Sequence, residues 1–284
     1  MKAKICQFLG IWSSRVAILI ILSVMGYLLL HIILNGIGVI SWDFLTKPPT
    51  SGMTAGGIFP AIVGTILLVT LAIAISLPLG LMSAIYLVEY SSENSKFVRL
   101  VNSAIHNLNG IPSIVFGLFG LAFFVKFLGF GTSLLSASLT LSVMILPTVI
   151  VTSVEAIRSV PNSFREASMA LGATKWETIL KVVLPAGFPG IITGAILGVG
   201  RAAGETAPIL FTGAVFYMRG LPTSILDPVM ALPYHLFVLA TEHPNISKVT
   251  PIQYGTALVL LLLVLTISLT AAIIRYRFRK SRRW

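Results

Sequence analysis

Two oppositely charged side chains lie four residues apart in an apolar segment of the chain. They are Arg201 and Glu205, within the stretch GRAAGETAP. Side chains four residues apart share one face of a helix, so the two can pair or line a common path. A charge at the centre of a bilayer costs about 2.5 to about 17 kcal/mol, so such residues are retained where they face a protein interior or water.

The guanidinium of Arg201 suits a particular ligand. Its planar fork offers parallel N–H donors that match a tetrahedral oxyanion. Two interpretations therefore remain open: Arg201 and Glu205 form a polar station on an anion-transport route, or they form an ion pair that only holds packed helices together.

The composition identifies the class of protein that holds this pair. Of the 284 residues, 56% are hydrophobic and 10% are charged, and the mean hydropathy is +0.96. Soluble domains carry about 25% charged residues, so a soluble fold is excluded. A net charge of +11 would suggest nucleic-acid binding in a soluble protein. Here the basic tail 275–283 follows an apolar span, where retention of positive charge in the cytoplasm explains it better.

We predict an all-α membrane protein with six transmembrane helices. The spans are expected at residues 16–34, 58–88, 108–128, 134–154, 188–213 and 254–274. Residues 1–57 would form an N-terminal transmembrane helix and an external loop, and residues 58–284 a core of five transmembrane helices. The apolar run 229–240 contains Pro233 and is too short to span a bilayer, so we expect an external or re-entrant segment there.

The basic residues predict the orientation. With the N-terminus in the cytoplasm, the inside holds fifteen Lys and Arg: Lys2, Lys4, Arg15, Lys96, Arg99, Arg158, Arg165, Lys175, Lys181 and the six of the tail. The outside holds four: Lys47, Lys126, Arg219 and Lys248. This asymmetry places both termini in the cytoplasm.

No motif in the chain indicates an enzyme. The sequence contains neither a G-x-x-x-x-G-K-[ST] phosphate loop nor an H-E-x-x-H pair. Its four histidines form no ligand-spaced cluster with carboxylates or with Cys6, the single cysteine, so we expect no metal site. If transport uses ATP, another polypeptide must hydrolyse it.

The loop between the fourth and fifth spans, at about 155–187, contains two capping boxes. Ser163 to Glu166 would start one short helix, which Gly172 would end, and Thr174 to Glu177 would start a second, which ends before Pro185. An ordinary interfacial loop is the simpler alternative. A DNA-binding helix-turn-helix is disfavoured because two spans flank the segment.

The same loop resembles the EAA signature of ABC-importer permeases, E-A-A-x3-G-x9-I-x-L-P. The matching residues are Glu166, Ala167, Ser168, Gly172, Val182, Leu184 and Pro185. Ser168 replaces the second Ala of the signature and Val182 replaces its Ile, which are mild departures. In that family the loop forms coupling helices that dock into a groove on the cytoplasmic ATPase. The resemblance therefore implies that Glu166, Ala167, Ser168, Gly172, Leu184 and Pro185 serve ATPase coupling.

Two further segments narrow the resemblance. NGIPSIVFG at 109–117 and GRAAGETAP at 200–208 resemble the phosphate-specific permeases, and the whole chain is similar to the PstA-type family of type I importers. The resemblance implies a substrate pathway that includes Ser113, Arg201, Glu205 and Thr206. Arg201 would supply positive charge for the anion, and Glu205 would pair with it when no anion is present and so limit trapping.

The resemblance also implies an assembly in the bacterial cytoplasmic membrane. A PstC-like permease would pair with this chain, two PstB-like ATPases would use ATP and Mg, and a PstS-like periplasmic protein would deliver phosphate. No cofactor is expected in this chain, and the expected contacts are with membrane lipid and not with nucleic acid. Two alternatives remain: an ABC permease for another oxyanion such as phosphonate or sulfate, and a secondary transporter or channel. A membrane enzyme is more distant.

Overall fold

The computed structural model describes residues 2–92, 95–218 and 220–281, without the side chains of 2–6, 8–10 and 278–281. Arg219 and the side chain of Cys6 therefore lie outside the described part. The α-helices are α1 (Lys2–Gly36), α2 (Trp42–Thr46), α3 (Phe59–Ile85), α4 (Lys96–Asn109), α5 (Ser113–Gly120), α6 (Leu134–Arg158), α7 (Asn162–Ala170), α8 (Lys175–Thr178), α9 (Leu184–Gly204), α10 (Ala207–Thr212), α11 (Leu232–Thr241) and α12 (Ile246–Ser281).

Shorter elements extend or connect these helices. Three π-helical segments are η3 (Tyr86–Tyr90), η4 (Leu121–Phe127) and η5 (Ile179–Val183), and two 3-10 turns are η1 (Ile37–Val39) and η2 (Ser51–Met53). The strands β1 (Pro49–Thr50) and β2 (Ala55–Gly56) pair antiparallel.

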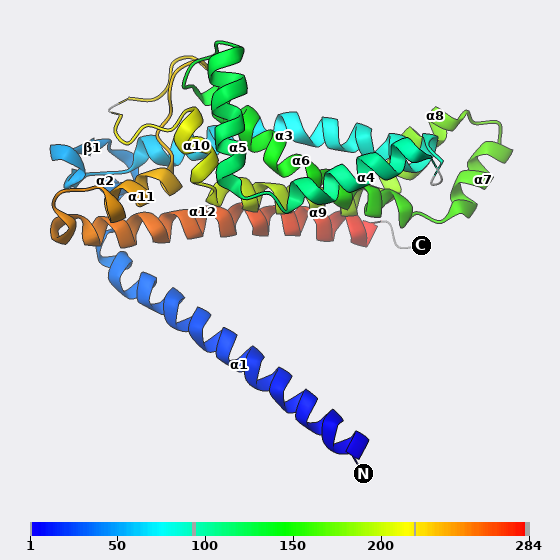
Figure 1. Cartoon of the computed structure of the whole chain (residues 1–284), viewed down its shortest axis with the longest axis horizontal. Helices are drawn as coiled ribbons and strands as arrows, with labels where there is room; N and C mark the ends of the chain where they lie inside the picture. Colours follow the sequence, from blue (N-terminus) through cyan, green and yellow to red (C-terminus); the bar gives the residue numbers. More distant parts are fainter. Residues whose placement is uncertain (1, 93–94, 219, 282–284) are drawn as a thin grey trace.

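A bundle of long helices forms the body of the molecule, in which α3, α6, α9 and α12 run along one axis (Figure 1). The centre of the bundle is α6, in which 67% of the residues of the most apolar stretch are buried. Side chains of α3 and α6, among them Leu68, Leu141 and Ile145, meet Ile209 of α10 in the largest core cluster. The bundle leaves apolar surface outside, as expected for helices that face lipid.

Within the described residues, five helices are long and apolar enough to cross a membrane, and a sixth span is possible if a bent helix pair counts as one. The five are Ile11–Val39, Phe59–Tyr90, Leu134–Arg158, Lys175–Gly204 and Ile246–Arg277. The predicted all-α membrane fold is confirmed.

The third predicted span, 108–128, is wrong as a straight helix. Lys96–Asn109 and Ser113–Phe127 meet at an angle of 105°, and residues 108 and 109 belong to the first of the two helices. The break falls at Gly110 to Pro112. Proline has no N–H for the helix and disfavours α conformation in the residue before it, so the chain turns here.

The fifth predicted span, 188–213, is wrong at both ends. The helix begins at Lys175, runs through η5 into α9 and stops at Gly204. The second coupling helix therefore does not end before Pro185, which lies in the first turn of α9, where a missing N–H is tolerated. At the other end, the ring of Pro208 would clash with the carbonyl of Gly204 in a continuous helix, because the two are four residues apart.

The two ends of the bundle differ. The helices α7 and α8 lie at one end, toward which both chain termini point, and the β1–β2 hairpin, α2 and α11 lie at the other (Figure 1). In α11, Pro233 lies in the first turn and does not interrupt the helix. The helix α1 leaves the bundle at an angle (Figure 1), and no residue of its most apolar stretch is buried within this chain.

Candidate functional site

The pair Arg201–Glu205 lies at the point where α9 ends. Arg201 is in the last turn of α9, Gly204 is its last residue, and Glu205 has an extended backbone with φ −79° and ψ 130°. The chain resumes as α10 at Ala207. Arg201 therefore lies where the helix dipole favours a cation, and Glu205 lies in a two-residue break rather than on a helix face.

Arg201 and Glu205 approach each other across this break. Arg201 Nε lies 3.7 Å from Glu205 Oε1, and the two side chains are 31% and 20% exposed. The contact is within ion-pair range but longer than a hydrogen bond. The predicted pairing is therefore confirmed, and its length and exposure describe a pair that is looser than a hydrogen-bonded ion pair.

The helix that begins at Ser113 packs beside the segment that follows the break. A side chain at Gly117 of α5 would meet the backbone of Ala207 at 2.8 Å, and one at Gly120 would meet Thr212 at 2.8 Å. The helices α5 and α10 therefore run side by side in the same direction. Ser113 is the first residue of α5, one turn before Gly117, and the side chains of Ser113 and Thr206 are both partly exposed.

The packing of α9 on α6 gives the depth of the site. The positions of Gly194 and Gly198 face Thr152 and Val149 of α6, so the two helices are antiparallel. Arg201 follows Gly194 by seven residues and so lies on the same side of α9, toward α6. Thr148 lies ten residues of α6 before Arg158, which is at the α7 end, so about 15 Å separates the two at 1.5 Å per residue. Because Gly198 faces Val149, Arg201 lies still farther from the α7 end than Thr148. The pair is therefore well inside the span.

The segment between α6 and α9 forms a compact knob. Gly172 has φ +87°, the left-handed conformation that glycine adopts without strain, and it follows α7 as predicted. The capping box of α8 is also confirmed: Glu177 N donates to Thr174 Oγ1 at 3.3 Å, and Thr174 N donates to Glu177 Oε2 at 3.0 Å. The box predicted at Ser163 is wrong, because α7 begins at Asn162 without a side-chain cap.

The predicted coupling residues divide into an outer and an inner group. Glu166 and Ala167 are exposed, while Leu184 and Pro185 are half-buried where α9 begins. Ser168 bonds to Thr178 through their hydroxyl groups at 2.9 Å, so it ties α7 to α8. Three apolar side chains of the knob are largely exposed: Leu171 (89%), Trp176 (51%) and Met169 (48%). Such a patch is typical of a surface that another protein covers.

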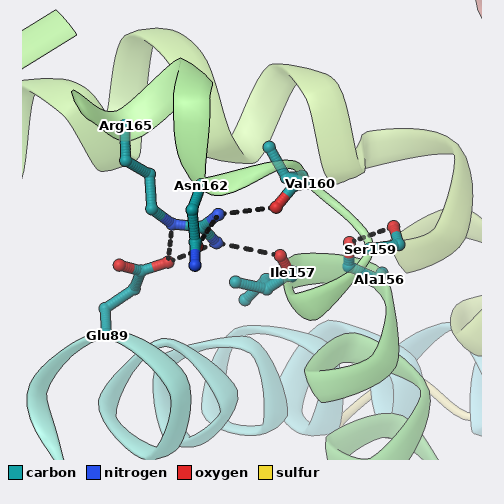
Figure 2. A network of polar contacts seen from close by, with 7 residues as sticks. All are labelled: Glu89, Ala156, Ile157, Ser159, Val160, Asn162 and Arg165. Carbon is teal, nitrogen blue, oxygen red and sulfur yellow. Dashed lines mark hydrogen bonds and ion pairs between the residues drawn. The ribbon is translucent and has the colours of Figure 1, made fainter. Parts of the chain in front are cut away.

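A buried ion pair attaches the knob to the bundle (Figure 2). Arg165 of α7 donates to Glu89 Oε1 of η3 from Nε at 3.0 Å and from Nη2 at 2.8 Å. It also donates to the carbonyl oxygens of Val160 at 2.6 Å and Ile157 at 3.0 Å, and to Asn162 Oδ1 at 3.3 Å. The side chains of Arg165 and Glu89 are only 13% and 8% exposed. One guanidinium therefore joins α7 to the ends of α3 and α6.

Sequence reasoning missed the pairing of Glu89 with Arg165. The signal available was an acidic residue at the end of an apolar span, with no basic residue within one helical turn. Because 76 residues separate the partners, local spacing could not identify the pair. Among the described residues, no group of three or more His, Cys, Asp and Glu side chains is arranged to hold a metal ion.

Comparison with known proteins gives consistent matches. Residues 76–284 match the family described as binding-protein-dependent transport system inner membrane component. The chain is 32% identical over 282 residues, 95% of each chain, to the probable ABC transporter permease protein YqgI of Bacillus subtilis (strain 168). It is 38% identical over 232 residues, 81% of this chain and 73% of the relative, to the phosphate transport system permease protein PstA 1 of Mycobacterium tuberculosis (strain ATCC 25618 / H37Rv).

A solved structure has the same fold. It is a bacterial alginate ABC transporter in complex with an alginate pentasaccharide-bound periplasmic protein. The match has a TM-score of 0.69 at 14% identity and covers 95% of each chain. At this identity the likeness concerns the fold alone.

Proposed function

Because the chain belongs to the family of inner membrane components of binding-protein-dependent transport systems, we propose that it is a permease subunit of an ATP-driven phosphate importer. The relatives named as phosphate permeases support the substrate, and they align with most of this chain. The observation that carries the mechanism is the loose Arg201–Glu205 pair at the break between α9 and α10.

Phosphate in transit would compete with Glu205 for Arg201. The anion needs positive charge and hydrogen-bond donors inside a low-dielectric span, but it must also leave. A guanidinium can hold two phosphate oxygens at once, while hydroxyl groups of Ser113 and Thr206 can donate further bonds. When the anion departs, Glu205 again neutralises Arg201, which lowers the cost of an empty site.

Other subunits complete the machine in this proposal. The side chains of Arg201 and Glu205 are partly exposed in this chain, so a homologous PstC-like permease would form the opposite wall of the path. One of two PstB-like ATPases, which use ATP and Mg, would dock on the knob, where Glu166, Ala167 and the exposed Leu171 lie. A PstS-like periplasmic protein would deliver phosphate to the opposite end. The assembly would lie in the bacterial cytoplasmic membrane.

Uptake of labelled phosphate by the assembled complex tests this function. We expect Arg201→Gln to reduce uptake at least about 100-fold at unchanged complex abundance, since a charge-assisted bidentate contact is worth about 3 kcal/mol. Arg201→Lys should give an intermediate loss because it keeps the charge but not the fork. Glu205→Gln should be milder.

The matched control is Lys248→Gln, which removes an exposed cation near the opposite end of the bundle. Wild-type uptake in Arg201→Gln would assign the pair to helix packing. Uptake of sulfate in preference to phosphate by the wild-type complex would reject the substrate assignment.

A further inference from the structure

The helix α4 has two exposed flanks of opposite character. Its buried edge, with Val98 and Ile105, packs against Ile150 of α6 and Leu87 of η3. To one side of this edge lies the polar flank, which we define as Arg99, Asn102, His106 and Asn109. To the other side lies the apolar flank, which we define as Phe97, Leu100 and Ala104. The residues of both flanks are exposed in this chain.

Each flank borders a groove of its own kind. Along the polar flank, a groove of about 230 Å³ lies between Asn102 and His106 of α4 and Glu155 and Arg158 of α6. Along the apolar side, a groove of about 530 Å³ is lined by Met82 and Tyr86 at the end of the second span, together with Phe97. The first groove therefore combines charged, amide and imidazole side chains with apolar lining residues such as Ile105 and Ile150, whereas the second is mostly apolar.

The polar flank reaches into the membrane-spanning part of the bundle. It begins at the α7 end, where α4 follows η3, and it ends where Thr148 Oγ1 of α6 lies 3.4 Å from Asn109 Oδ1. Ten residues of α6 separate Thr148 from Arg158, which is about 15 Å. Amide and imidazole side chains at such depth are costly against lipid and are retained where they meet water or protein.

We propose that the polar flank of α4 is the inner wall of the anion path, over which the oxyanion passes from the level of Arg201 toward the cytoplasm. This inference rests on the proposed function. The charges of the surface fit such an occupant: Lys96 and Arg99 lie in the first turn of α4, and Arg158 lines the groove together with one carboxylate, Glu155. The amides of Asn102 and Asn109 provide neutral donors between the mouth and Arg201.

The apolar flank provides matched controls for a test by cysteine reactivity. In a Cys6→Ser background, the complete transporter would carry Asn102→Cys or His106→Cys on the polar flank, and Leu100→Cys or Ala104→Cys on the apolar flank. Inside-out membrane vesicles would be treated with a membrane-impermeant sulfonate-bearing thiol reagent. We expect the polar-flank cysteines to react at least about tenfold faster, because the thiolate is the reactive form and lipid disfavours it.

The charge of the reagent gives a second readout. A path that attracts anions should favour the sulfonate reagent over a trimethylammonium reagent of similar size at positions 102 and 106, because like charges at its mouth repel the cation. Inorganic phosphate supplied with its binding protein and ATP should slow the labelling at these positions only.

Equal labelling of the two flanks would overturn the inference. Unreactive cysteines on both flanks would also overturn it and would show that another protein surface covers the polar flank. Fast labelling of the polar flank that sulfate slows and phosphate does not would support the path and reject phosphate as the substrate. The failure of the inference and the failure of the proposed function are thus distinguishable.

Discussion

At the scale of single residues, Arg201 and Glu205 form an ion pair that is longer than a hydrogen bond. The extended conformation of Glu205 removes its side chain from the regular face of α9 and leaves a 3.7 Å separation. Arg165 and Glu89 are the contrast, since two hydrogen bonds of 3.0 Å or less join them in a site that is nearly buried. In the proposed function the first pair exchanges partners during transport, whereas the hydrogen bonds of the second join α7 to η3.

Another single residue, His235, predicts a dependence of stability on pH. It is 1% exposed in α11. Burial lowers its pKa from 6.5 to about 4, and a hydrogen bond to the backbone of Phe216 opposes this shift only in part. Between these two values the unfolded chain binds a proton that the folded chain does not, so stability falls as the pH falls from 6.5 toward 4.

We expect the free energy of unfolding to decrease by roughly 2 kcal/mol between pH 7.5 and pH 5, from a shift of this size. Thermal unfolding of the detergent-solubilised protein as a function of pH measures the effect. In His235→Asn, which has no titratable group at this position, the decrease should be smaller by that amount. An unchanged pH profile in this variant would contradict the assignment.

Part of the candidate site was predictable at this scale. The capping box of α8 followed from Thr174 and Glu177. The pairing of Arg201 with Glu205 was predicted from a shared helix face, but the pair forms across the break after Gly204. The end of α9 did not follow, because an average over an apolar window hides Gly204 and Pro208, which have their effect through backbone sterics. Glu89 could not be paired from the sequence, because the fold alone brings it to Arg165.

At the scale of elements, Arg165 links the knob to the ends of α3 and α6. Two of its five hydrogen bonds reach Glu89 of η3, two reach the carbonyl oxygens of Ile157 and Val160 at the end of α6, and the fifth reaches Asn162 of α7 (Figure 2). We expect a force on α7 to reach α3 and α6 through this residue. Packed elements joined in this way shift as units rather than deform continuously.

Charge reversal tests this transmission. Glu89→Arg or Arg165→Glu alone should reduce phosphate uptake per ATP hydrolysed at least about tenfold, because removing one partner of a buried pair costs about 3 to 5 kcal/mol. The double variant, Glu89→Arg with Arg165→Glu, should recover part of the coupling. ATPase activity and uptake are measured in the same vesicles.

A control is available at the other end of the bundle. The ion pair of Lys47 with Asp43 is exposed, so its reversal should change coupling little. If both reversals had the same effect, or if the double variant of Glu89 and Arg165 recovered nothing, the clamp would have no specific part in coupling.

The elements themselves were predicted unequally well. Long apolar runs such as α3 and α6 were identified from hydropathy because composition alone marks them. The bend between α4 and α5 was missed, although Gly110 and Pro112 stood in the sequence, because the apolar residues continue across it. The continuation of α8 into α9 was missed because a π-helical segment shifts the hydrogen bonds by one residue, which local signals do not reveal.

At the scale of the whole molecule, the distribution of basic residues over the two ends of the bundle fits the predicted orientation in the membrane, with the α7 end in the cytoplasm. Within the described residues, the basic residues assigned to the cytoplasm are on elements at the α7 end or on α1 and α12, whose outer ends point toward it, and few are at the opposite end. Glu89 pairs with Arg165 of α7, so Ser92, three residues later, lies at the α7 end. Ser247, in the first turn of α12, lies at the hairpin end (Figure 1).

These two serines provide an isosteric pair for a test of topology. Both are exposed, and each would be changed to Cys in a Cys6→Ser background. Because positive charge is retained in the cytoplasm, a membrane-impermeant thiol reagent should label Ser247→Cys but not Ser92→Cys in intact cells. In inside-out vesicles the pattern should reverse. Labelling of Ser92→Cys in intact cells would mean that the orientation is the reverse of the predicted one. The knob could then not meet an ATPase that works in the cytoplasm.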